Sequence, residues 1–180
     1  MTLGTINYLS DKIADLITRT KGLNDIHDDL GKIIFPISFW SDLDDSIVLN
    51  DTAGDKNLPN VTIEDLPAGY TIERAVMMFK HGGILDSSGA ENKTVDAQVM
   101  SIDASAARDS VVTAINIPSD SFLTPADSWR GGDVIIGDND ISAEVTTEAT
   151  YYPTWELADV TAASLTFYEV QTGILVWYSI

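Results

Sequence analysis

The sequence predicts an all-β protein, an antiparallel β-sandwich of jelly-roll or Greek-key type preceded by one N-terminal α-helix. Short runs rich in β-branched and aromatic residues recur along residues 33–180, and turn-forming residues separate them. The first 30 residues instead follow a helical period. This change of period divides the chain into an N-terminal oligomerisation or docking helix over residues 1–31 and a sandwich domain over residues 32–180.

The helix is predicted from a heptad pattern with alternating spacings of three and four residues. The first core position of each heptad holds Ile6, Ile13, Thr20 and His27, and the second holds Leu9, Leu16, Leu23 and Leu30. Gly31 follows at once and suits a helix end. The seam predicts a homo-oligomer, a dimer or a trimer, with contacts made by Ile6, Leu9, Ile13, Leu16, Leu23 and Leu30.

An alternative for this segment is a helix that packs on the chain's own sheet. Ile17 and Ile26 widen the apolar stripe toward that of an ordinary globular helix. Gly22 also costs about 1 kcal/mol inside a helix and could divide the segment in two.

The expected strands are separated by segments too short for the helical crossovers of a parallel sheet. They comprise residues 33–40, 46–49, 60–66, 71–80, 94–102, 110–117, 133–147, 163–170 and 173–180. The segments KHGG, WRGGD and QTG are expected to be turns, which places His81 in a turn. The last strand is the most apolar, so we expect it inside a sheet or at a subunit contact.

Composition excludes several classes of function. The chain has no cysteine, which excludes disulfides and thiolate metal sites. It carries 28 acidic and ten basic residues, and 23 of the acids lie beyond residue 40. Such a surface repels nucleic acid. No apolar run approaches the roughly 20 residues of a membrane-spanning helix. Because the surface is acidic and no such run is present, we expect neither a nucleic-acid partner nor a membrane partner.

No pattern of residues indicates a catalytic centre. The two histidines lie far apart, and no nucleophile motif is present. We therefore expect no enzymatic activity, no cofactor and no metal site. A hydrolase using two carboxylates and a calcium site remain weaker alternatives. The calcium candidates are Asp133, Asp138 and Asp140, in a segment where acidic residues also suit tight turns.

The tryptophans divide into two expected groups. Trp40 and Trp177 fall inside apolar runs and are expected in the core. A second group lies in or near expected loops and is predicted to form a ligand or subunit contact: Trp129, Arg130, Tyr152 and Trp155. Trp, Tyr and Arg are enriched at interfaces, and aromatic rings also bind sugars. A carbohydrate-binding module that adheres to host glycans is therefore the alternative function.

Taken together, these features resemble the structural proteins of tailed bacterial or archaeal viruses. The resemblance lies in the N-terminal helix, the acidic all-β body without cysteine and the closing VQTGILVWYSI. The segments TIERAVMMFKHGGI and ENKTVDAQVMSI are also similar to hairpins of phage virion proteins. The resemblance implies a capsid decoration, head-fibre or tail-surface protein of the virion, assembled in the host cytoplasm. Its partners would be its own copies and other virion proteins such as a major capsid protein.

Overall fold

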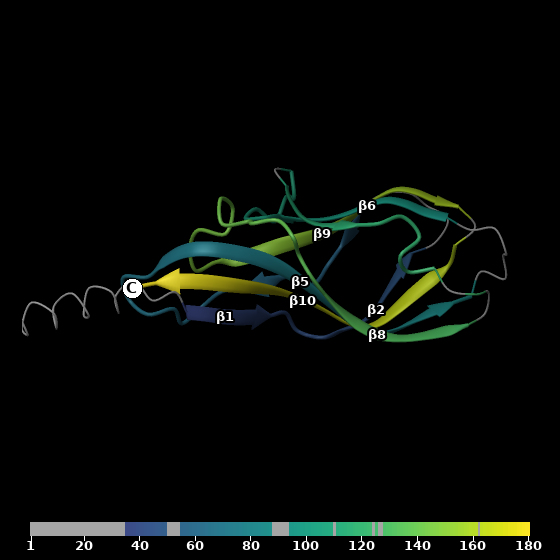
Figure 1. The fold of residues 1–180 in the computed structure, drawn as a ribbon, viewed down its shortest axis with the longest axis horizontal. Coiled ribbons are helices and arrows are strands. Elements are labelled where there is room, and N and C mark those ends of the chain that lie inside the picture. Colours follow the sequence, from purple (N-terminus) through teal and green to yellow (C-terminus); the bar gives the residue numbers. More distant parts are fainter. Residues whose placement is uncertain are drawn as a thin grey trace, which may run out of the picture.

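The fold is known from a computed structural model that describes residues 35–49, 55–87, 94–109, 111–123, 125, 128–161 and 163–180. The described residues form strands and turns and contain no helix (Figure 1). The predicted helix lies outside these ranges and stays a prediction. The same holds for its contact residues Ile6, Leu9, Ile13, Leu16, Leu23 and Leu30.

The strands of the described part are all paired antiparallel. They are β1 (Phe35–Trp40), β2 (Asp44–Leu49), β3 (Lys56–Asn57), β4 (Val61–Thr62), β5 (Thr71–Asp86), β6 (Thr94–Asp103), β7 (Val112–Ile117), β8 (Trp129–Ile136), β9 (Thr150–Thr161) and β10 (Leu165–Ser179).

These strands form two packed sheets. In sheet A, β1 and β2 pair with successive stretches of β10, which pairs with β5, and β5 pairs with β8. In sheet B, β3 and β4 pair with successive stretches of β9, which pairs with β6, and β6 pairs with β7. Each sheet therefore has four strand positions, and the prediction of an antiparallel β-sandwich is confirmed.

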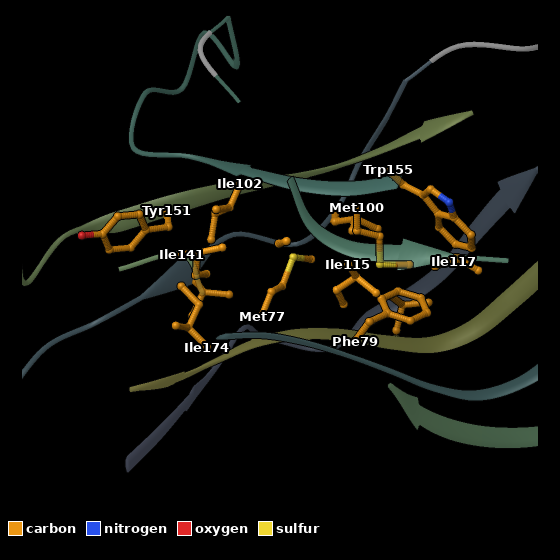
Figure 2. Close-up of a cluster of buried hydrophobic side chains, with 14 of the residues drawn as sticks. Met77, Phe79, Met100, Ile102, Ile115, Ile117, Ile141, Tyr151, Trp155 and Ile174 are labelled. Carbon is orange, nitrogen blue, oxygen red and sulfur yellow. The ribbon is translucent and has the colours of Figure 1, made fainter. Parts of the chain in front are cut away.

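The core lies between the two sheets. Side chains from β6 and β9 of sheet B face side chains from β5 and β10 of sheet A (Figure 2). Ile102, Met100 and Trp155 come from the first layer, and Met77 and Ile174 come from the second. Alternate residues of each strand supply these contacts, as the period-two pattern of the sequence requires.

The segments KHGG and QTG lie inside strands, so their prediction as turns is wrong. β5 continues through His81 to Asp86, and β10 continues through Thr172 to Ser179. In both strands, the residues that face the core change from odd to even numbers part of the way along. This change falls near Gly82 in β5 and near Glu169 in β10. Glu169 has a positive φ of 52°. A Cβ on Gly82 would lie 2.3 Å from the Glu169 carboxylate, so the bends of the two strands lie side by side.

The segment WRGGD also lies inside a strand. β8 begins at Trp129 and contains Gly131 and Gly132, and Gly131 pairs with Gly83 of β5. Glycines on both strands allow the two backbones to approach closely while both strands bend. The expected strand over residues 133–147 instead ends at Ile136, and turns follow it.

β9 was not predicted as a strand, and it contains a proline, Pro153. A proline cannot donate a ladder hydrogen bond and normally argues against a central strand. Pro153 lies opposite the gap between β3 and β4. Its carbonyl accepts from the Leu58 N–H, in that gap, at 3.0 Å. A residue's N–H and C=O point the same way, so the missing donor faces this break and no ladder bond is lost.

Candidate functional site

A polar pocket of about 380 Å³ lies on the outer surface of sheet B. Strands β3 and β9 form its floor, and the turn that follows β6 forms one wall. Its lining residues are Asp55, Asn57, Ala106, Ala107, Arg108, Val111, Thr154 and Glu156. The volume falls within the range of pockets that hold small ligands.

The floor of the pocket is set by the pairing of distant strands. Asn57 pairs with Thr154, and Thr154 pairs with Ser101 of β6, so all three side chains share one face. The Ser101 hydroxyl donates to the Glu156 carboxylate at 2.5 Å. The Thr154 hydroxyl is buried and has no hydrogen-bond partner among the described residues.

The wall of the pocket is a single turn fixed at several points. The Ser105 N–H donates to Asp103 at 2.8 Å, and the Ala104 N–H donates to Glu144 at 2.7 Å. Arg108 has a positive φ of 52°. Its guanidinium donates to Asn60 at 2.9 Å and lies 5.3 Å from the ring centre of Tyr152.

This arrangement can hold a polar ligand. Two carboxylates, an amide and a hydroxyl offer acceptors and donors, and the guanidinium adds a positive charge. Sequence reasoning missed Asp55, Asn57, Arg108 and Glu156, because strand pairing across about 100 positions of the chain brings them together. Only Tyr152 was singled out in advance, and it lies under Arg108 at the side of the pocket.

The structure does not bring the predicted contact residues together. Trp129 is 58% exposed on sheet A, with its ring 5.6 Å from that of Tyr168. Arg130 follows it and donates to the Ser121 carbonyl at 2.7 Å. Tyr152 is half-buried on sheet B. Trp155 is fully buried in the core, so its expected position in or near a loop is wrong, and it offers no surface for a ligand or subunit contact.

Two other tryptophans also differ from expectation. Trp40 is 38% exposed and Trp177 is partly exposed, whereas both were expected in the core. Both lie on the strands of sheet A at positions that face away from sheet B, because their neighbours Phe39 and Val176 pack into the core.

The calcium candidates are also dispersed. Asp133 accepts from its neighbour's N–H at 2.8 Å, and Asp140 accepts from the N–H groups of Ser142 at 2.9 Å and Ala75 at 3.2 Å. Desolvation raises the pKa of Asp140, but these backbone hydrogen bonds outweigh it and lower the pKa below its usual value. Among the described residues, no three histidine or acidic side chains are grouped as a metal site.

His81 lies in the core and not in the predicted turn. It is 1% exposed, and its ring centre lies 6.0 Å from those of Phe79 and Phe122 and 5.4 Å from that of Phe167. Neither ring nitrogen has a hydrogen-bond partner among the described residues. Burial lowers the pKa of His81 below 6.5, while nearby Asp133 raises it in part.

We expect His81 to make the fold less stable in mild acid. Because its folded pKa is lowered, the unfolded chain binds the additional proton as pH falls through 6.5. The contribution of neutral His81 is therefore complete above this pH and is lost below it. Urea unfolding of the wild type and His81→Phe from about pH 8 to about pH 5.5 tests this expectation. The wild type should lose stability relative to the variant as pH falls, whereas a constant difference would contradict the expectation.

Comparisons with known proteins gave no match to a family model, to a curated protein or to a solved structure. Within the described ranges, no helix is long and apolar enough to span a membrane.

Proposed function

We propose that this chain is a structural protein of a virion surface, either a capsid decoration or a head-fibre or tail-surface protein, and that it assembles as a symmetric homo-oligomer. The strand order carries this proposal. The first strand position, β1 with β2, lies beside the last strand, β10, and the second, β3 with β4, lies beside the second to last, β9. Eight strand positions in this order correspond to a jelly roll, a fold used by viral capsid proteins and by lectins.

Two sequence features support the structural role. The heptad pattern before β1 suits association of copies, and the acidic sandwich suits a surface that keeps assembled particles apart and soluble. A fold alone does not fix a function, so the virion assignment also draws on the resemblance to tailed-virus proteins.

Immunogold labelling tests the virion assignment. Antibodies raised against the recombinant chain should decorate particles released by the source organism at regular positions. Mass spectrometry of the same purified particles should detect the chain in a constant ratio to the major capsid protein. A chain found only in cell extract, with unlabelled particles, would contradict the proposal.

The polar pocket favours one second candidate, a carbohydrate-binding module. Lectin domains also use jelly rolls, and the pocket combines carboxylates, an amide and a nearby tyrosine. A glycan array should then show binding that Glu156→Gln abolishes and the exposed, distant Glu64→Gln retains. Binding of equal strength in both variants would place the ligand elsewhere, and a blank array would remove this candidate.

A further inference from the structure

The outer face of sheet A, the face turned away from sheet B, carries apolar side chains at all four strand positions. Residues paired directly across antiparallel strands share a face. One such row joins Trp40, Gly173, Met78 and Ile136. Neighbouring rows add Leu175, Trp177 and Val134. We name this surface the outer patch and define it as Trp40, Met78, Val134, Ile136, Leu175 and Trp177.

The outer patch combines a packed centre with an exposed margin. The Trp40 ring covers Gly173, where an added Cβ would lie 2.8 Å from the ring, and Met78 beside it is only 5% exposed. At the margin, Ile136 is 60% exposed and Val134 is 49% exposed. One face of an antiparallel sheet usually meets water with polar residues, so an apolar outer face indicates a contact surface.

The charge of the outer patch differs from that of the chain as a whole. Its rows contain two cations, Arg74 and Lys80, and no acidic side chain. Arg74 lies 4.9 Å from the Trp177 ring centre, and Lys80 donates to Gln171 at 3.2 Å. The full chain carries a net charge of −18. Repulsion between carboxylates opposes contact between most surfaces of two copies, but the paired rows of the outer patch contribute no carboxylate to such a contact.

The position of the N-terminal segment also favours a second copy of the chain as the partner of the outer patch. The predicted seam ends at Leu30, and β1 begins at Phe35. Five backbone steps reach at most roughly 18 Å. A seam that joins copies would therefore hold their β1 strands near one axis, and β1 carries Trp40 of the outer patch. We infer that the outer patch packs against a second copy of this chain. This inference rests on the proposed homo-oligomer.

A thiol placed at the margin of the patch tests the inference in the full-length chain. The chain has no cysteine, so Ile136→Cys introduces its only thiol. Val111→Cys is the matched control, because Val111 is 39% exposed and precedes β7 on the other sheet. The rate of maleimide labelling would be measured for both variants in the wild-type background and with the seam broken by Leu16→Asp and Leu23→Asp. Sedimentation would give the mass of each sample.

We expect the Ile136→Cys thiol to react slowly in the oligomer and rapidly in the seam-broken monomer, while the Val111→Cys thiol reacts at the same rate in both. Equal labelling of Ile136→Cys in an intact oligomer overturns this inference and leaves the proposed oligomer standing. Slow labelling in the monomer also overturns it, because the chain's own N-terminal segment would then cover the patch. A monomeric wild type overturns both.

A second variant measures the strength of the contact. Ile136→Asp places an unpaired charge in the proposed interface, at a position exposed enough to leave the fold intact. The protein concentration at which half of the oligomer dissociates should rise by roughly 100-fold. An unchanged midpoint in Ile136→Asp would contradict the inference even if the seam variants fail to dissociate the oligomer.

Discussion

Replacing Trp155 with alanine is expected to lower the free energy of unfolding by about 3–5 kcal/mol. Its side chain is fully buried, and its ring centre lies 5.5 Å from that of Phe79, 5.4 Å from that of Phe122 and 5.1 Å from that of Phe167. Alanine would leave a cavity at the centre of this aromatic cluster. Urea unfolding followed by circular dichroism measures the effect without relying on tryptophan fluorescence.

Trp129 is the matched control for this prediction. It is 58% exposed and contacts mainly Gly83 and Tyr168, so Trp129→Ala should cost about 1 kcal/mol or less. Comparable losses for both variants would mean that Trp155 does not hold the core together. A Trp155→Ala protein with the free energy of unfolding of the wild type would contradict the burial of Trp155 and support the surface contact that its sequence context first indicated.

Replacing Gly132 with alanine should destabilise the protein by about 1–3 kcal/mol or more. An added Cβ would lie 2.3 Å from the His81 carbonyl oxygen and 2.7 Å from that of Gly82. Both oxygens belong to the backbone of β5, so relief would require β5 and β8 to move apart where they pair. Thermal or urea unfolding measures this loss.

Gly131 provides a control one residue away. An added Cβ at Gly131 has no neighbour within 4 Å, and β8 has a paired partner on one side only. Gly131→Ala should therefore change the free energy of unfolding by no more than about 0.5 kcal/mol. Equal effects at the two glycines would contradict the close approach of β5 and β8.

Much of the fold could be predicted from residue pattern. Alternating apolar residues correctly identified antiparallel strands and a sandwich, because that period follows from burying one face of a sheet. The prediction of turns was wrong where turn-like segments form bends inside long strands. The glycines of KHGG and WRGGD allow two strands to bend together, and no local rule distinguishes this bend from a turn. The strand β9, which contains Pro153, was not predicted at all. The break between β3 and β4 that accommodates this proline is visible only after strand pairing.

The candidate sites were harder to predict, for the same reason. The polar pocket is lined by Asp55, Arg108 and Glu156, which are far apart in the sequence, so no spacing in the sequence predicts it. The outer patch depends on which face of β1 and β10 turns away from sheet B. Trp40 and Trp177 looked like core residues because their apolar neighbours along the chain are buried. The side of the sheet to which each belongs is a property of the paired structure.

The mass of the full-length chain in solution tests the central claim, that copies of this sandwich assemble through the N-terminal seam. Sedimentation equilibrium of the wild type should give a discrete dimer or trimer over a range of protein concentrations. The Leu16→Asp and Leu23→Asp substitutions should together convert that species to a monomer whose β-sheet circular dichroism is retained. A wild type that is monomeric at every concentration would contradict the claim.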